Sequence, residues 1–264
     1  MKVSLSYLSV VFGLVVFGLM FNVESDAKIE SSGAWLLDEE NGGKIKDASG
    51  NGIDGEIEGD AKFVKGKFGN AMEFNGQDTL VLFENEDPNH AFALHRDKDV
   101  TFMFWVQPHD VAHRGIFWTR GNPKGDDADR FNIYSGPGET FGFDYREVGG
   151  NIHGLIQGIE LKNKEWTHLA VTREGNTYNL FHNGKQVSQA KDPSPKLPET
   201  ASWMISGRPG FIFLGFIDEL AFFDAVLSKN DITNIMDNGL EIAALSVEPT
   251  AKLATAWARI KTSK

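Results

Sequence analysis

Residues 215–228 read GFIDELAFFDAVLS, and this stretch does most to decide the fold. It is an apolar run interrupted by Asp218 and Glu219, and its length and Phe content are typical of a buried β-strand. Its last residue, Ser228, can cap a helix, with Asp231 three residues later to favour the first turn. Apolar residues follow at helical spacing before Asn-Gly ends the pattern, at Ile232, Ile235 and Met236. The sequence therefore predicts a strand followed by one short helix.

The chain before this stretch consists of short apolar runs separated by Gly, Asn, Asp and Pro. Residues 100–106 and 168–172 form two such runs, and residues 177–182 alternate with period two. The segments 173–176 and 182–185 contain Gly and Asn, which tolerate positive φ, so both are predicted to be hairpin turns. Strands at this spacing, without long helices between them, predict an antiparallel sandwich or barrel.

A second informative stretch is DASGNGIDGEIE, residues 47–58, whose spacing almost fits the calcium loop of an EF-hand. An EF-hand also needs an amphipathic helix on each side of the loop. Residues 40–46 and 59–69 contain glycines and lack an apolar stripe at helical spacing, so neither is expected to form a stable helix. The EF-hand interpretation therefore fails, and the stretch is expected at a turn of the chain.

Seven segments carry a resemblance to a known family when they are taken in order. They are 33–38 (GAWLLD), 47–52 (DASGNG) with Gly55, 69–76 (GNAMEFNG), 100–106 (VTFMFWV), 165–172 (EWTHLAVT), 178–185 (YNLFHNGK) and 215–228. Together they resemble the laminin G-like, pentraxin-like domains of the concanavalin A-like lectin/glucanase superfamily. The resemblance implies an all-β jelly-roll sandwich of two antiparallel sheets, with one short helix near the end.

Aromatic side chains are expected to fill the space between the two sheets. The resemblance places Trp35, Phe74, Phe104 and Trp166 in this core, where large rings can fill a gap of about 10 Å. Adjacent residues on a strand point to opposite faces, so Phe104 and Trp105 cannot both lie in the core.

The two ends of the chain differ from the middle. Residues 1–27 combine a basic start, an apolar run and small residues before position 28, which predicts a secretory signal peptide. The alternative is an uncleaved membrane anchor, because the apolar run approaches the length of a spanning helix. Residues 28–245 are predicted to form the domain, and residues 246–264 a linker and tail. The protein is therefore expected outside the cytoplasm, secreted or periplasmic, with no membrane span after signal cleavage.

Composition restricts the partners. The net charge is −11, which argues against nucleic acid and anionic membrane surfaces and suits divalent cations. The chain has no Cys, so disulfides are excluded, and its 20 Phe and 6 Trp must supply the core.

Catalytic motifs are weak in this sequence. A retaining glucanase needs two carboxylates about 5–5.5 Å apart, which on one strand means an E-x-D-x-E pattern. Asp144 and Glu147 are three residues apart and would point to opposite faces, and Glu84 and Glu86 precede a predicted turn at Pro88. G-x-S-x-G and H-E-x-x-H motifs are also absent. The protein is predicted not to be an enzyme, with a glycoside hydrolase of the glucanase type kept as the third possibility.

Calcium is the cofactor that the resemblance implies. The matching positions are Asp47 and Asn51 in the D-x-S-G-N-G loop and Asp218 in the Ile-Asp-Glu strand, which would supply the oxygen ligands that calcium prefers. The alternative is that Asp47 only accepts backbone N–H bonds in a turn, and that Asp218 pairs with Arg208.

Ligand recognition is the predicted task of the domain. Carbohydrate binding combines an aromatic face with planar polar groups, and Trp118, Arg120, Arg130 and Tyr134 could provide both on neighbouring strands. The predicted partner is a carbohydrate or a cell-surface glycoconjugate. The alternative is an extracellular protein bound by an adhesion or scaffold module of the same fold.

Overall fold

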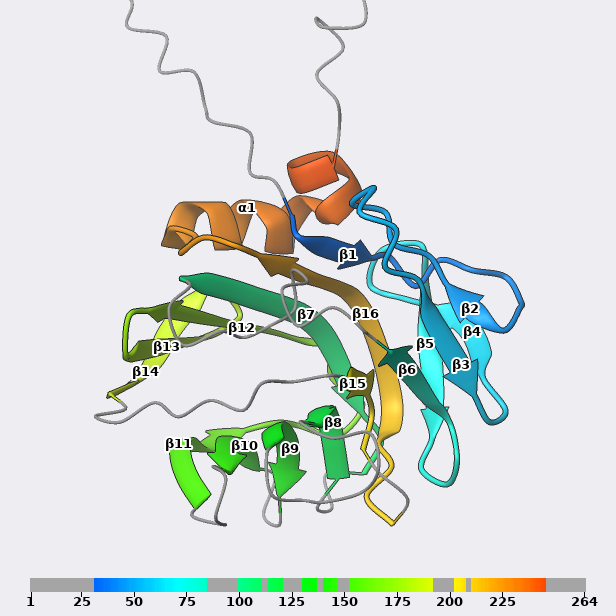
Figure 1. Ribbon diagram of the computed structural model, residues 1–264, viewed down its shortest axis with the longest axis horizontal. Coiled ribbons are helices and arrows are strands. Elements are labelled where there is room, and N and C mark those ends of the chain that lie inside the picture. The colour runs from blue at the N-terminus through cyan, green and yellow to red at the C-terminus, as the bar shows by residue number, and fades with distance from the viewer. Residues whose placement is uncertain are drawn as a thin grey trace, which may run out of the picture.

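The structure is a computed structural model that describes residues 31–84, 99–110, 114–120, 130–136, 140–146, 152–191, 202–207 and 210–245. Two antiparallel sheets, A and B, face each other across an apolar core (Figure 1). The predicted signal peptide and the predicted C-terminal tail lie outside these residues. Among the residues described, no helix combines the length and apolar character needed to cross a membrane.

Sheet A contains eight strands. Their order is β14 (Lys185–Lys191), β13 (Thr177–His182), β12 (Thr167–Glu174), β7 (Val100–Pro108), β16 (Leu214–Phe223), β5 (Asn70–Asn75) and β4 (Lys62–Lys65), with β1 (Gly33–Trp35) paired to β16. The predicted strand in residues 215–228 is therefore β16, and it lies near the middle of the sheet.

Sheet B also contains eight strands. Their order is β11 (Ile152–Glu160), β10 (Thr140–Arg146), β9 (Arg130–Gly136), β8 (Arg114–Arg120), β15 (Ser202–Ile205), β6 (Leu80–Glu84), β3 (Gly55–Glu58) and β2 (Lys44–Ile45). The predicted jelly-roll sandwich of two antiparallel sheets is confirmed.

The core between the sheets is aromatic. Trp35 of β1 packs against Phe83 and Trp203 of sheet B, with ring centroids 5.0 and 5.1 Å away. Phe74 and Phe104 are buried in the same cluster, as predicted. Trp105 lies on the opposite face of β7, where its ring is 5.2 Å from that of His168.

The prediction for Trp166 is wrong. Its side chain is only half-buried and is not part of the core between the sheets. Leu169 and Val171 of β12 face the core, so the alternation of the strand places Trp166 on the outward side. It lies one residue before the strand begins, with its ring 6.3 Å from that of Phe216.

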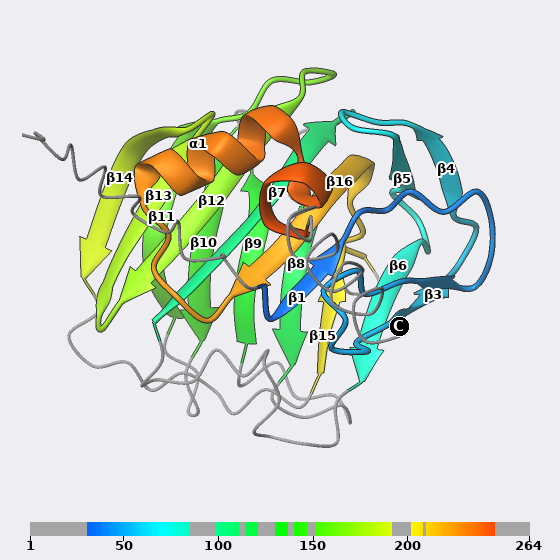
Figure 2. The ribbon, with the colours of Figure 1, turned by 90° about the horizontal axis from the view of Figure 1, so that it is seen from above.

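The outer face of sheet A is covered by α1 (Lys229–Asn238) and the following π-helical turn η1 (Glu241–Leu245) (Figure 2). The predicted cap is present: the Ser228 hydroxyl accepts the Asp231 N–H, and the Asp231 carboxylate accepts the Ser228 N–H. Ile232 and Ile235 face the sheet and form a second apolar cluster with sheet A residues such as Phe223. The helix therefore shields the apolar residues of this face from water.

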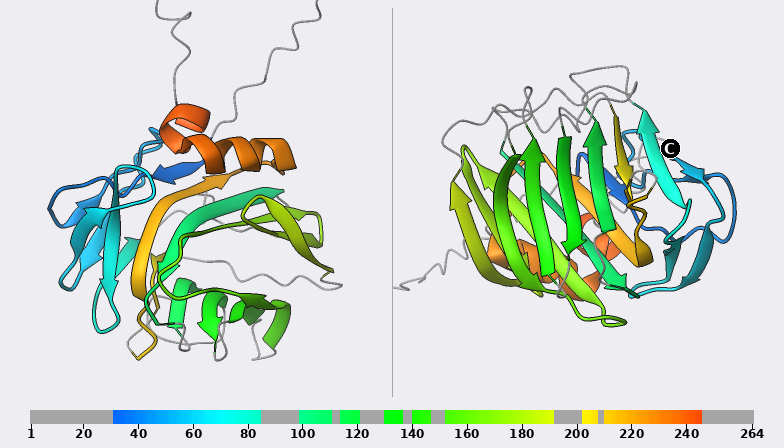
Figure 3. Two further views of the ribbon diagram at one scale, coloured as in Figure 1. Left: turned by 180° about the vertical axis from the view of Figure 1, so that it is seen from behind. Right: turned by 90° about the horizontal axis from the view of Figure 1, so that it is seen from below.

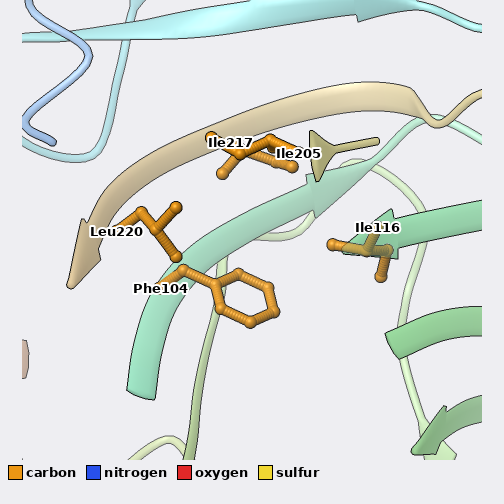
Figure 4. Close-up of a pocket in the computed structure, with 5 residues that line it drawn as sticks. All are labelled: Phe104, Ile116, Ile205, Ile217 and Leu220. Atoms are coloured by element: carbon orange, nitrogen blue, oxygen red, sulfur yellow. The ribbon is translucent and has the colours of Figure 1, made fainter. Parts of the chain in front are cut away.

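A small apolar void lies in the core beside β16. Its volume is about 10 Å³, and Figure 4 shows the residues that line it, Phe104, Ile116, Ile205, Ile217 and Leu220. The void adjoins a bulge in β16 between Asp218 and Ala221, where the pairing with β7 shifts. The space is about one water molecule in size and has an apolar lining, so it is a packing defect and cannot hold a ligand.

Candidate functional site

The outer face of sheet B is turned away from sheet A, and Figure 3 (right) shows its green strands β8 to β11 side by side. Ile133 of β9 and Phe143 of β10 are buried in the core between the sheets. Alternation along each strand therefore places Asn132 and Tyr134 of β9, and Gly142 and Asp144 of β10, on the outer face.

Strand register brings the predicted ligand-binding residues onto this same face. Trp118 of β8 lies opposite Asn132 of β9, and Arg120 is two residues further along β8. Arg130 and Tyr134 are each two residues from Asn132 on β9. Because residues two apart on a strand share a face, all four predicted positions belong to one surface. The side chains of Trp118, Arg120 and Arg130 lie outside the described part of the structure, so their placement here is that of the backbone.

Glycines shape the surface around Tyr134. The half-buried ring lies against Gly142, where a Cβ atom would come within 2.3 Å of the Tyr134 Cζ. On the other side Tyr134 is paired with Gly115, where a Cβ would come within 2.8 Å of the Gly207 Cα. A larger residue at Gly142 would displace the Tyr134 ring, and a larger residue at Gly115 would displace the backbone at Gly207, so both positions need glycine.

Two polar residues of this face were not among the predicted site residues. Asn132 is 3% exposed and Asp144 is 8% exposed, and the two are directly opposite each other on β9 and β10. The Oδ1 atom of Asn132 accepts no hydrogen bond in the structure. The signal that could have identified Asn132 is its place between Arg130 and Tyr134 at period two, which puts all three on one face.

The Asp47 loop has a structural role at the other side of the sandwich. One carboxylate oxygen of Asp47 accepts hydrogen bonds from the N–H of Ala34 at 3.1 Å and of Ser49 at 2.9 Å, and the other accepts from Ile53 N–H at 3.1 Å. The amide of Asn51 donates to the backbone carbonyl of Ser32 at 3.0 Å. The loop is thereby fixed to β1, in the way expected for a turn-forming Asp.

Asp218 occupies a different environment, in the β16 bulge on the outer face of sheet A. Its Oδ2 accepts the N–H groups of Lys67 at 2.8 Å and Phe68 at 3.0 Å, while its Oδ1 has no hydrogen-bond partner. Burial raises the pKa of the Asp218 carboxyl to about 8. Burial likewise raises the pKa of Glu219 to about 7, and this carboxylate accepts the Leu240 N–H just after α1. Asp218 therefore bonds the turn between β4 and β5 to the sheet, and Glu219 bonds the segment after α1 to it.

The three predicted calcium ligands bond to separate parts of the backbone. Asp47 and Asn51 hold the loop against β1, whereas Asp218 holds the turn between β4 and β5. Within the described residues, no group of three or more His, Asp or Glu side chains is arranged to hold a metal ion. The side chain of Arg208, the alternative partner of Asp218, is outside those residues.

The raised pKa of Asp218 gives a testable pH dependence. The folded protein keeps a proton on this carboxyl that the unfolded chain releases near the ordinary Asp pKa of 3.8, so stability should fall as the pH rises from about 4 to about 8. Asp218→Asn retains an oxygen for the two N–H donors and removes the buried charge. We expect it to raise the free energy of unfolding by at least about 1 kcal/mol more at pH 8 than at pH 5.

The measurement is chemical denaturation at both pH values in the presence of a chelator. The matched control is Asp60→Asn, which alters an exposed carboxylate. The change in its free energy of unfolding between pH 5 and pH 8 should equal that of the wild type. An Asp218→Asn effect that is equal at pH 5 and pH 8 would show that the buried acid is ionised throughout this range.

The family model Laminin_G_3, described as "Concanavalin A-like lectin/glucanases superfamily", matches residues 75–233, which is more than half of the chain. No curated protein sequence matches the chain.

Solved structures share the fold at low sequence identity. One is domain 4 of AbnA, a GH43 extracellular arabinanase from Geobacillus stearothermophilus, in complex with arabinotriose; it has a TM-score of 0.61 and 18% identity over 80% of this chain and 100% of that domain. A second is the binding domain of botulinum neurotoxin DC in complex with rat synaptotagmin II, with a TM-score of 0.62 and 12% identity over 79% of this chain and 51% of that one. A third is the binding domain of Paraclostridial Mosquitocidal Protein 1, with a TM-score of 0.60 and 14% identity over 78% and 52% of the two chains. The present chain thus spans about half the length of these toxin binding domains. The family match and the two-sheet architecture agree, and the chain belongs to the concanavalin A-like lectin/glucanase superfamily.

Proposed function

We propose that this protein is a non-catalytic carbohydrate-binding module that acts outside the cytoplasm and takes an oligosaccharide on the outer face of sheet B. The observation that carries the proposal is the shared face of Trp118, Arg120, Arg130 and Tyr134 on β8 and β9. The arabinotriose complex of the AbnA domain shows that a protein of this fold binds such a ligand. The predicted signal peptide supports the location.

The chemistry of this face suits a sugar. A sugar ring has an apolar face that packs on an aromatic ring and hydroxyl groups at its edge that need hydrogen-bond partners. Tyr134 provides a half-buried aromatic side chain on this face, next to Gly142. The arginines at positions 120 and 130 add planar donors to the same surface.

The arrangement around Asp144 supports a non-catalytic role. A retaining glycosidase needs a second carboxylate about 5–5.5 Å away, and on a sheet this residue would be a cross-strand neighbour. The residues opposite Asp144 are Asn132 on β9 and Gly154 on β11, neither of which is an acid. Release of reducing sugar from a β-glucan would reject this part of the proposal.

Binding of defined trisaccharides tests the proposed face. We expect arabinotriose, xylotriose or cellotriose to give saturable heat in calorimetric titrations, and Trp118→Ala or Arg120→Ala to weaken binding by about tenfold or more, because truncating a central contact removes over 1.4 kcal/mol. Lys62→Ala, an exposed position on β4 of sheet A, is the matched control and should bind as the wild type does. Full binding by Trp118→Ala would exclude this face.

Binding of an extracellular protein domain, with no glycan bound on an array, would favour the adhesion alternative.

We also propose that a calcium ion stabilises the folded domain by binding at Asp218, one of the three predicted ligand positions. The supporting observation is the buried Asp218 Oδ1 without a partner, because an uncompensated buried oxygen is a candidate cation ligand. An ion bound only by the native state at a hundredfold excess over its Kd adds about 2.7 kcal/mol, so calcium should raise the Tm by several degrees. The rise should disappear in Asp218→Asn. Equal Tm values in calcium and in chelator would refute the calcium proposal and leave the carbohydrate proposal intact.

A further inference from the structure

A groove of about 460 Å³ lies at one edge of the sandwich, and none of the residues proposed above for carbohydrate or calcium binding lines it. It is lined by residues near the end of β11, the start of β12 and the turn between β13 and β14, so both sheets contribute to it. Figures 1 and 2 show these four strands at one edge of the sandwich. Its volume is within the range of 300–1,000 Å³ that is typical of small-molecule sites. The residues that matter for its chemistry are Glu160, Lys162, Glu165, Trp166, His182 and Asn183.

Trp166 forms the aromatic wall of the groove. Its ring is supported on one side by Phe216, 6.3 Å away, and Phe216 is in turn packed edge-on against His109 at 4.3 Å. Neither Phe216 nor His109 lines the groove, so this packing holds the indole from behind while part of it remains exposed. A ring held in this way can bind a ligand with little loss of side-chain entropy.

Asn183, another lining residue, has a fixed orientation. Its backbone N–H donates to the His168 carbonyl and its side-chain Oδ1 accepts the His168 N–H, both at 2.8 Å. Its φ of 49° belongs to the turn between β13 and β14. Because the carboxamide oxygen is engaged, the NH₂ group is the part of Asn183 that can serve a ligand, as a donor.

His182 and Glu160 complete the polar part of the groove. Burial lowers the pKa of His182, although the negative charge of Glu160 opposes this shift, so the imidazole is neutral at pH 7 and offers one donor and one acceptor. Glu160 and Glu165 outnumber Lys162 along the lining, so the groove is acidic. An acidic groove disfavours uronic acids, sulfated sugars and phosphates.

We propose that this groove is a second carbohydrate site, which takes a neutral sugar ring against Trp166 with its hydroxyl groups bonded to Asn183, His182 and Glu160. The site is separate from the outer face of sheet B and depends on the proposed function only for the class of ligand. Two sites on one module allow one glycan surface to be held at two points, which raises the avidity without any new contact at either site.

The test uses the indole N–H signals of the 6 Trp residues in ¹H–¹⁵N NMR spectra of the full chain. Trp166→Phe and Trp118→Phe assign the two relevant signals, and arabinotriose, xylotriose, cellotriose and a glucuronic acid disaccharide are the probes. We expect a neutral trisaccharide to shift the Trp166 signal in a saturable way, and the shift to persist in Trp118→Ala. Trp166→Ala and Glu160→Gln should each weaken this binding event by about tenfold, whereas Lys62→Ala should leave it unchanged.

The outcomes separate the two sites. A Trp118 signal that moves while the Trp166 signal stays still would overturn the second site and leave the proposed function standing. A Trp166 signal that responds only to the acidic disaccharide would overturn the neutral ligand class. If neither signal moves with any neutral probe, both proposals fail for these sugars. If Trp166→Ala does not fold, Glu160→Gln decides, because its exposed side chain is not part of the core.

Discussion

Trp35→Ala should lower the free energy of unfolding by about 3–5 kcal/mol, as expected for truncation of a large side chain in a packed core. Trp35 is fully buried, and its ring contacts Phe83, Trp203 and Phe222 at centroid distances of 5.0, 5.1 and 6.3 Å. Trp35 belongs to sheet A, whereas Phe83 and Trp203 belong to sheet B, so the substitution opens a cavity where the two sheets meet. It also leaves the Ile53 carbonyl without the indole N–H that donates to it at 2.8 Å.

Urea denaturation followed by far-UV circular dichroism measures this effect. Trp35→Phe restores most of the ring contacts but not the N–H donor, so we expect it to cost about 1–3 kcal/mol. The exposed control Val187→Ala, at a side chain that is 41% accessible, should change stability by less than about 0.5 kcal/mol. A Trp35→Ala loss below about 1 kcal/mol would mean that the surrounding aromatics close over the cavity.

Asp47→Ala has the second-largest expected effect, a loss of about 2–4 kcal/mol. The carboxylate accepts from the N–H groups of Ala34, Ser49 and Ile53 and from the Ser49 hydroxyl, and alanine would leave these donors without their shared acceptor. Removing a charged acceptor from partly buried donors costs about 1–3 kcal/mol for each donor that water cannot reach. The effect arises in the turn itself and is expected with or without calcium.

Asp47→Asn is the matched control, because its one remaining carbonyl oxygen can still accept from Ala34 and Ser49 while Ile53 loses its acceptor. We expect about half of the loss seen for Asp47→Ala. Ile53 also accepts the Trp35 indole N–H, so the two sites share a segment and the double variant Trp35→Ala/Asp47→Ala should lose less than the sum of the single losses. Strict additivity would show that the loop and the aromatic core are independent.

Local signals in the sequence were sufficient for much of the fold. The cap at Ser228 and the apolar spacing of Ile232 and Ile235 depend on neighbours within one or two helical turns, and α1 begins and packs as this pattern predicts. The hairpin between β13 and β14 likewise follows from Asn183 and Gly184, which both adopt positive φ. Such features need no information from distant parts of the chain.

The candidate site was less accessible to sequence reasoning. Trp118 and Tyr134 could be proposed from residue type and neighbouring strands, but the pairing of β8 with β9 and the shift in its register decide that they share a face. Asn132 and Asp144 were not predicted to share this face because they become neighbours only through the pairing of β9 with β10. The resemblance placed Trp166 in the core, whereas the alternation of β12, continued back by one residue, turns it outward.

The sequence by itself determined the antiparallel strands, the final strand with its capped helix and the turn at Asp47, because each is specified by short-range periodicity or by a side chain that bonds its own backbone neighbourhood. The jelly-roll sandwich in particular was implied by the resemblance of seven ordered segments to a known family. Only the tertiary structure decided which residues meet across strands and sheets. It put the Trp35 ring between sheets A and B, buried the Asp218 carboxyl and gathered the walls of the edge groove from β11, β12 and the β13–β14 turn. These contacts join residues that are far apart in the chain, and they depend on strand order and register, which local propensity does not encode.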